Sequence, residues 1–324
     1  MKIVYMGTPD FAVAPLEAMI KEGYEITAVV TQPDRPKGRG KDLAFSPVKE
    51  CAVKNGIPVF QPLKIRMAEE VEILKKYEAD IFVVAAFGQI LSEEILNMPK
   101  YGCINIHASL LPKYRGAAPI QWAVLNGDEK SGVTIQQMAK GVDTGDILAV
   151  KEVKLDSKET GDSLFDKLMK AGAELLVETL PKIEKGEVIP IPQKEEEATH
   201  VGKLTKEMGK LDFSLSATDL ERKVRGLNSW PGTFTCYNGK SLKVWEADVC
   251  NKALFMDRFP SFSEKEYEAC APGTVMKTSK DTLFVKTGEG VLLISSIQAE
   301  GKKRMSVHDY LLGAKIPEGI ILGE

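Results

Sequence analysis

Short apolar runs alternate with segments of helical apolar spacing over the first 110 residues of this chain. Residues 2–6 form the first apolar run, and residues 11–21 follow with apolar side chains at helical spacing. The alternation continues, predicting strands at 25–30, 57–60, 80–86 and 102–107 and helices at 47–55, 68–77 and 93–98. Strands and helices in this order form an α/β, mainly parallel sheet with helices on both faces. Ligands of such sheets bind beyond the carboxyl ends of the strands.

The composition and the pattern of apolar residues change near residue 187 and divide the chain into two parts. Before it, we predict two later strands at 133–138 and 147–153 and a long helix at 163–185. Residues 187–207 contain two prolines and three consecutive glutamates, which favour an extended linker. Beyond it, short apolar runs between glycine turns predict strands at 232–237, 242–247, 273–277, 282–286 and 291–298. Such a series is typical of a small β-barrel of oligonucleotide-binding (OB-like) type. We therefore expect domains at 1–186 and 208–324, joined by the linker 187–207.

The charge balance excludes a generic polyanion-binding protein, because the formal net charge is −3. Residues 203–324 carry 18 Lys and Arg against 16 Asp and Glu, so the C-terminal part is mildly basic. This excess is compatible with a nucleic-acid partner but does not establish one.

Cysteine and histidine spacing gives no sign of a disulfide framework or a metal centre. The five cysteines are scattered without a CxxC pair, and the three histidines lie far apart in sequence. The N-terminus MKIVYMG lacks the apolar core of a signal peptide, and no run of about 18 apolar residues exists. We expect a cytoplasmic protein with reduced thiols, no metal and no membrane partner. We also expect a monomer, because no heptad pattern is present.

Three residues form the strongest candidate for chemistry. Asn105 and His107 lie at the end of a predicted strand, where alternate side chains point to one face. Asp143 lies in the glycine-flanked segment KGVDTGDIL. A carboxylate holds an imidazole in one tautomer, and an amide N–H beside it stabilises a developing oxyanion. This set suffices for acyl transfer to an amine without a covalent nucleophile.

Other interpretations of these residues stay open at this point. His107 could be a hydrogen-bonded structural residue, and Asp143 could serve turn chemistry alone. A serine hydrolase using Ser109 is disfavoured, because Ser109 is two residues from His107 and no G-x-S-x-G elbow is present. An NAD enzyme is disfavoured too, because Gly7 is followed by Thr8 and Pro9 instead of a G-x-G-x-x-G pattern.

Taken together, the motifs resemble the 10-formyltetrahydrofolate-dependent formyltransferases over nearly the whole chain. The run N-I-H-x-S-L-L-P-x-Y-R-G with a downstream D-T-G-D-I is the specific signature. The loop QPDRPKGRGK and the C-terminal segments narrow the resemblance to members that act on initiator methionyl-tRNA. The matching segments are GTPDFA (7–12), TQPDRPKGRGK (31–41), SPVK (46–49), FQP (60–62), AAFGQIL (85–91), NIHASLLPKYRGAAPIQWA (105–123), GVDTGDIL (141–148), KLTKEMGKLDF (203–213), VRGLNSWPGTF (224–234) and GKKRMSVHDYLLG (301–313).

The resemblance implies a Rossmann-like catalytic domain, a linker and a C-terminal barrel that contacts tRNA. It implies 10-formyltetrahydrofolate as formyl donor and Asn105, His107 and Asp143 as the catalytic trio. The methionine amine would attack the formyl carbon directly. Asn105 and His107 would stabilise the tetrahedral intermediate, and Asp143 would orient His107 and assist proton transfer to N10. The implied folate-binding residues are Phe87, Gly88, Gln89, Ile90, Leu91, Ser109, Leu110, Leu111 and Pro112.

The resemblance also implies basic residues along a path for tRNA. The loop 32–46 would enter the acceptor stem, where Arg and Lys contact phosphates and position the RNA. Each of these residues alone is compatible with an ordinary solvated surface charge. The expected tRNA-binding residues are Arg35, Lys37, Arg39, Lys41, Lys203, Lys206, Lys302, Lys303 and Arg304.

Related activities remain as alternatives. A formyltransferase for an amino-sugar nucleotide or for glycinamide ribonucleotide would keep the trio. The amino-sugar enzyme would not need the GRGK loop, and the glycinamide ribonucleotide enzyme would lack the C-terminal barrel. A formyl-tetrahydrofolate hydrolase would use water in place of the amine, and a non-catalytic RNA-binding protein would not need the trio. Departures from the family pattern are Met208 and Phe213 after the linker and the unusual run at 248–270.

Overall fold

A computed structural model describes residues 1–37 and 42–323. The chain divides into two compact units. The first contains Met1–Ile120, Glu129–Leu155 and Ser163–Gly202, and the second contains Gln121–Asp128, Asp156–Asp162 and Lys203–Glu324. The segment 187–202 therefore folds with the first unit, whereas the predicted boundaries at 186 and 207 stay predictions.

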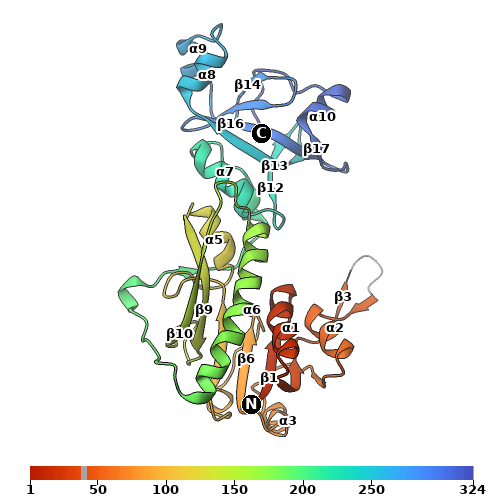
Figure 1. Ribbon diagram of the computed structural model, residues 1–324. Helices are drawn as coiled ribbons and strands as arrows, with labels where there is room; N and C mark the ends of the chain where they lie inside the picture. The colour runs from red at the N-terminus through yellow and green to blue at the C-terminus, as the bar shows by residue number, and fades with distance from the viewer. Residues whose placement is uncertain (38–41, 324) are drawn as a thin grey trace. The chain divides into compact units, whose positions relative to one another are not determined.

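The first unit is built on a seven-stranded, mainly parallel sheet, which confirms the predicted class (Figure 1). The strand order is β10-β9-β7-β6-β1-β2-β5, with only β9 and β10 antiparallel to their neighbours. The strands are β1 (Lys2–Gly7), β2 (Glu25–Val30), β5 (Val59–Phe60), β6 (Ile81–Ala85), β7 (Cys103–His107), β9 (Lys130–Gln137) and β10 (Ile147–Lys154). Strands β1 and β6 are almost wholly apolar and buried. Strand β7 is also mostly buried but carries Asn105 and His107 among its apolar residues.

Helices cover this sheet, and short elements join them. The elements are η1 (Asp10–Ala12), α1 (Val13–Lys21), α2 (Pro47–Lys54), α3 (Ala68–Lys75), α4 (Glu93–Leu96), α6 (Gly161–Lys185) and η2 (Glu195–Glu197). Most of helix α5 (Pro119–Leu125) belongs to the second unit, which contains Gln121–Asp128. Ser46 and Ser92 cap α2 and α4 by accepting a backbone N–H from the first turn. These caps explain why both helices begin where the sequence predicts.

Helix α6 lies along the sheet (Figure 1), against β7 and β9. A Cβ atom added at Gly172 would stand 3.1 Å from the Ile106 side chain and 3.5 Å from that of Val133. Ile106 and Val133 alternate with Asn105, His107 and Thr134 along their strands, so the polar residues point to the other face. The long helix thus fixes which face of the sheet is left for a site.

The loop expected at 32–46 contains a short hairpin instead. Strands β3 (Arg35–Lys37) and β4 (Asp42–Ala44) pair antiparallel on either side of the glycine-rich residues, which lie outside the described part of the chain. The expected linker 187–207 is also more structured than predicted, with β11 (His200–Val201) paired in parallel to β8 (Arg115–Gly116).

The second unit contains an antiparallel sheet of order β12-β13-β16-β15-β14, with β17 beside β16. Its elements are η3 (Glu207–Gly209), α7 (Ala217–Gly226), β12 (Thr233–Tyr237), β13 (Lys240–Cys250), α8 (Lys252–Arg258), α9 (Glu264–Ala269), β14 (Val275–Thr278), β15 (Leu283–Lys286), β16 (Val291–Ala299), β17 (Met305–Ser306) and α10 (Val307–Gly313). Within the described residues β12 and β14 do not pair, so a closed barrel is not confirmed. The unusual run at 248–270 forms α8 and α9, whose Phe255 packs against Phe284 of the sheet.

We predict that a bulky side chain at Gly172 destabilises the first unit. Gly172→Leu forces its side chain against Ile106 and Val133, and such overpacking costs about 1–3 kcal/mol. The midpoint of urea unfolding, followed by far-UV circular dichroism, should fall. Gly202→Leu is the control, because no atom of the described residues lies within 4 Å of the position of its Cβ. Equal midpoints for the two variants would contradict the packing of α6 described above.

Candidate active site

The end of β7 places Asn105 and His107 on one face of the sheet. The neighbouring strand β9 pairs Gln136 with Asn105 and Thr134 with His107. Directly opposed residues of an antiparallel pair project to the same face. The face opposite α6 therefore carries four polar side chains side by side on two strands.

Asp143 brings its carboxylate to these side chains from the loop after β9. Its Oδ1 accepts hydrogen bonds from Gln136 Nε2 at 2.8 Å and from Asn105 Nδ2 at 3.4 Å, and lies 3.6 Å from His107 Nδ1. Its Oδ2 accepts the backbone N–H of Gly116 at 2.9 Å. The structure thus brings the three predicted catalytic residues together, although Asn105 and Asp143 are 38 residues apart in sequence.

His107 is held at both ring nitrogens. Its side chain is buried, and Nε2 lies 2.9 Å from the carbonyl oxygen of Tyr114. A carbonyl only accepts, so Nε2 carries the proton of this hydrogen bond. Nδ1 is left facing Asp143 and the open face of the site.

Three residues in the loops after β7 and β9 have a left-handed backbone conformation. Asp143 has φ +53°, Tyr114 φ +59° and Ala118 φ +66°. Such conformations are unfavourable for residues other than glycine and persist only where the surroundings hold them. Tyr114 supplies the carbonyl that binds His107, and Asp143 supplies the carboxylate, so two of the strained residues are those that place functional groups.

Two residues of this site, Thr134 and Gln136, are absent from the sequence prediction. Both are almost completely buried on β9. Thr134 Oγ1 donates to Ser109 O at 2.7 Å and accepts from Leu111 N at 3.1 Å. Gln136 Nε2 binds Asp143, while its Oε1 has no hydrogen-bond partner within the described residues. The alternation of Thr134 and Gln136 with Val133 and Ile135 along β9 was the available signal.

The segment 109–112 folds directly beside this site. Ser109 is fully buried and donates its hydroxyl to Lys113 O at 2.6 Å, so it is committed to its own turn and is not aligned as a nucleophile. Leu111 is also buried, whereas Leu110 and Pro112 are partly exposed. Thr134 anchors the segment through the backbone of Ser109 and Leu111, as described above.

The predicted folate segment 87–91 is divided between core and surface. Phe87 and Leu91 are buried in the hydrophobic core, whereas Gly88 and Ile90 are exposed. Gln89 binds the backbone of the preceding loop, accepting from Ile65 N at 2.8 Å and donating to Pro62 O at 2.9 Å. The backbone of the segment and Ile90 are therefore the parts open to a ligand.

Of the residues of the first unit predicted to bind tRNA, Arg35 and Lys37 lie on strand β3. Arg35 is exposed and Lys37 ends β3, while Arg39 and Lys41 fall outside the described residues. The base of the hairpin is fixed by Lys49, which forms an ion pair with Asp34. This hydrogen bond from Lys49 holds the pKa of the Asp34 carboxyl below its ordinary value.

The remaining predicted tRNA-binding residues are exposed, and one of them stacks on an aromatic ring. They are Lys203, Lys206, Lys302, Lys303 and Arg304. The guanidinium of Arg304 lies 5.2 Å from the ring centre of Trp245 and pairs with Glu246, and Lys243 Nζ lies 5.5 Å from the same ring. Trp245 is not among the residues predicted from the sequence.

Other features of the first unit offer no competing chemistry. Burial raises the pKa of the Cys103 thiol to about 12, so the cysteine of β7 is not a thiolate nucleophile. Across residues 1–37 and 42–323, no cluster of three metal-ligating side chains occurs and no helix is long and apolar enough to cross a membrane.

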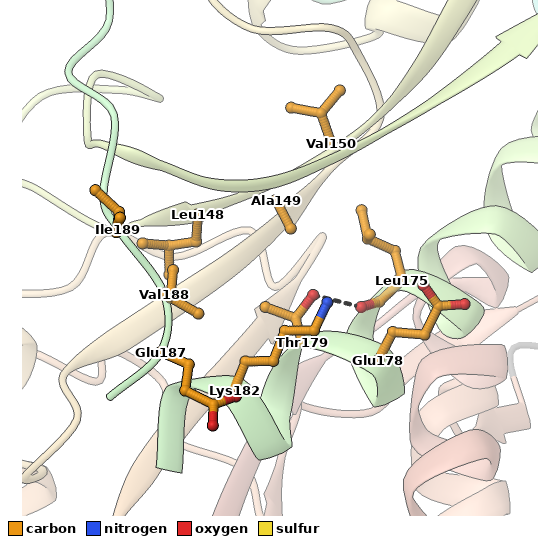
Figure 2. A pocket seen from close by; sticks show the side chains of 10 residues that line it. All are labelled: Leu148, Ala149, Val150, Leu175, Glu178, Thr179, Lys182, Glu187, Val188 and Ile189. Atoms are coloured by element: carbon orange, nitrogen blue, oxygen red, sulfur yellow. Dashed lines mark hydrogen bonds between the residues drawn. The ribbon is translucent and has the colours of Figure 1, made fainter. Parts of the chain in front are cut away.

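A pocket of about 470 Å³ lies between β10, α6 and the segment that follows the helix (Figure 2). Its lining includes none of the predicted site residues. The side chains around it are mainly aliphatic, with two glutamates and one lysine at helix α6 and its end. They belong to Leu148, Ala149, Val150, Leu175, Glu178, Thr179, Lys182, Glu187, Val188 and Ile189.

Comparison with known families covers almost the whole chain. Residues 1–180 match the formyl transferase family and residues 203–315 match the formyl transferase C-terminal domain. A methionyl-tRNA formyltransferase of Lachnospira eligens is 53% identical over 324 residues, which is all of both chains. The enzyme of the same name from Clostridioides difficile is 49% identical over 323 residues, again with 100% of both chains covered.

Solved structures share the fold at low sequence identity. WlaRD, a sugar 3N-formyltransferase crystallised with dTDP and 5-N-formyl-THF, matches with TM-score 0.65 and 18% identity over 94% of this chain and 99% of its own. HypX from Aquifex aeolicus, solved with tetrahydrofolic acid, matches with TM-score 0.62 and 16% identity over 99% of this chain and 50% of its own.

The full-length identity and the two matched domains agree with the trio brought together at the end of β7. The chain therefore belongs to the methionyl-tRNA formyltransferase family.

Proposed function

We propose that this chain transfers the formyl group of 10-formyltetrahydrofolate to the amino group of methionyl initiator tRNA, giving formylmethionyl-tRNA for translation initiation. The observation that carries the proposal is the convergence of Asn105, His107 and Asp143 in a chain whose whole length matches enzymes of that name. We propose that residues 1–186 act as the catalytic domain, 187–207 as the linker and 208–324 as the RNA-binding domain. One chain supplies the whole trio, and we propose a monomer acting in the cytoplasm.

The chemistry follows from the donors that surround Asp143. The unprotonated amine of methionine attacks the formyl carbon, and negative charge develops on the formyl oxygen. Asn105 Nδ2 and His107 Nδ1 already converge on one carboxylate oxygen, so an oxyanion beside it lies within reach of both. An imidazolium satisfies both neighbours of His107, since Tyr114 O and Asp143 are acceptors and a neutral ring carries one N–H.

Collapse of the tetrahedral intermediate requires two proton movements. The attacking nitrogen loses a proton, and N10 of the folate gains one as the C–N10 bond breaks. We assign the relay to Asp143, through water, because its carboxylate is the acceptor that all these donors share. The folate would lie against Ser109–Pro112 and the backbone of Phe87–Leu91, beside the face of the sheet opposite α6.

We propose that the antiparallel sheet of the second unit binds RNA. We propose an OB-like arrangement in which β13 presents Lys243 and Trp245 to the tRNA, together with Arg304 from the turn before β17. Lys302 and Lys303 would extend this surface, and Lys203 and Lys206 would contact the backbone near the linker. The hairpin β3–β4 would place Arg35, Lys37, Arg39 and Lys41 at the acceptor stem.

Removing one member of the trio should abolish most turnover without unfolding the chain. We expect Asn105→Ala and Asp143→Asn to lower kcat by about 10²–10⁴-fold, because each loses an oxyanion donor or the proton relay. The assay follows radiolabelled formylmethionyl-tRNA formed from 10-formyltetrahydrofolate. Lys140→Ala is the control, since its side chain is 82% exposed and pairs with Glu93 at the surface.

The same assay separates the rival activities. Formylation of a dTDP-linked amino sugar in place of methionyl-tRNA would leave the trio intact and refute the proposed acceptor. Loss of formyl from folate with no amine present would show a hydrolase. Full activity of Asp143→Asn would refute the role given to the carboxylate.

Basic residues of the second unit should act on tRNA and not on folate. We expect Lys302→Ala with Lys303→Ala to raise KM for tRNA and to lower the slope of log KM against log salt by about 1 for each phosphate interaction removed. KM for the folate should stay unchanged. Lys265→Ala, on the exposed face of α9, is the matched control. A double variant with the wild-type salt slope would remove these lysines from the RNA interface.

A further inference from the structure

The segment after α6 is hydrogen-bonded to the loops that carry the candidate site. Strand β11 pairs with β8, and Thr199 accepts Tyr114 N at its hydroxyl and Arg115 N at its carbonyl, both at 2.8 Å. Ile191 pairs with Ile147 at the start of β10. The segment after α6 is therefore hydrogen-bonded both to the turn after residues 109–112 and to the end of the Asp143 loop. It does more than connect α6 to the rest of the chain.

Gln193 lies between these two anchors and binds the Asp143 loop itself. Its Nε2 donates to the carbonyl oxygens of Asp143 at 2.9 Å and Gly145 at 2.6 Å, and its Oε1 accepts Arg115 Nε at 3.0 Å. Two carbonyls can face only the NH₂ group and an arginine can face only the oxygen, so the orientation of the amide is determined by its partners.

The side chain of Arg115 determines the orientation of the Gln193 amide. Its side chain is only 1% exposed, and Nη1 binds both carboxylate oxygens of Glu195, at 3.0 and 2.8 Å. A buried guanidinium needs such partners to offset its lost hydration. The next residue, Gly116, donates its N–H to Asp143 Oδ2. Gly116 therefore binds the carboxylate of Asp143, and Gln193, which Arg115 orients, binds its backbone carbonyl.

The Asp143 loop needs this external support. Its base is closed by a hydrogen bond from Gln137 N to Asp146 O at 2.8 Å, and Asp143 itself is in a left-handed conformation. Gly145 passes so close to Gln137 that an added Cβ would stand 1.6 Å from the carbonyl oxygen. A strained loop keeps its geometry only when surrounding contacts hold it.

We propose that Gln193, oriented by Arg115, is a positioning residue that fixes Asp143 relative to His107 and Asn105 during formyl transfer. This inference rests on the proposed function, because it assigns Gln193 a role in that reaction. Gln193 acts through Asp143 and does not need to touch either substrate.

Two substitutions distinguish the hydrogen bonds of Gln193 to the Asp143 loop from its hydrogen bond with Arg115. Gln193→Met keeps the shape and removes every side-chain hydrogen bond. Gln193→Glu keeps an acceptor for Arg115 but turns an oxygen toward the carbonyls of Asp143 and Gly145. Lys194→Met is the matched control, since Lys194 is 67% exposed and its amine pairs with Glu197 at the surface.

We expect both Gln193 variants to lower kcat by about 10–100-fold, because small displacements of a catalytic group have effects on this scale. KM for methionyl-tRNA and for 10-formyltetrahydrofolate should stay within about twofold, since both substrates keep the residues that bind them. The melting temperature should match that of Lys194→Met. Amide hydrogen exchange should become faster at residues 139–147 in both variants and stay unchanged in the control.

Wild-type kcat in both variants would overturn the proposal, as would a loss of kcat explained by a fall in melting temperature. Unchanged exchange at 139–147 would overturn it independently of any activity. If the wild-type chain formylates no methionyl-tRNA, the proposed function fails, and the exchange measurement still decides whether Gln193 holds the loop.

Discussion

The candidate site depends on the hydrogen bonds that the Asp143 carboxylate accepts. Three N–H groups from three parts of the chain donate to its two oxygens: Asn105 on β7, Gln136 on β9 and Gly116 after the segment 109–112. His107 Nδ1 lies 3.6 Å from Oδ1. A carboxylate surrounded by donors holds each of them in place. Two of these groups, Asn105 and His107, are the ones proposed to stabilise the oxyanion. One side chain therefore links the order of the site to the chemistry proposed for it.

The fold supplies the surfaces that make this convergence possible. Helix α6 covers the Ile106 and Val133 face of β7 and β9, so the polar side chains of the same strands remain together on the other face. The antiparallel step at β9 sets Gln136 directly opposite Asn105. The strained turns at Tyr114 and Asp143 then deliver a carbonyl and a carboxylate to His107. Surrounding contacts hold the backbone of both residues in this conformation.

Sequence periodicity predicted the mainly parallel sheet, and motif recognition predicted the trio, since strand ends and glycine turns have strong local signatures. The antiparallel sheet of the second unit was predicted, but its closure into a barrel was not confirmed, because pairing between distant strands leaves no local signal. The segment 187–207 looked like a simple linker because Gln193, Glu195 and Thr199 are polar and their partners lie about 80 residues away. Gln136 was missed for the same reason, since its importance depends on the cross-strand register with Asn105. The hairpin at 35–44 was missed because glycine and proline at 36–40 favour a loop.

If Asn105, His107 and Asp143 act as one unit in formyl transfer, single-turnover kinetics of a double variant will show it. Groups that act as a unit give strongly non-additive losses. The rate of formylmethionyl-tRNA formation would be measured for Asn105→Ala, for Asp143→Asn and for the two combined, at saturating folate and tRNA. We predict that the double variant is no more than about threefold slower than the slower single variant. Losses that multiply would show that the two residues act independently and would contradict the account.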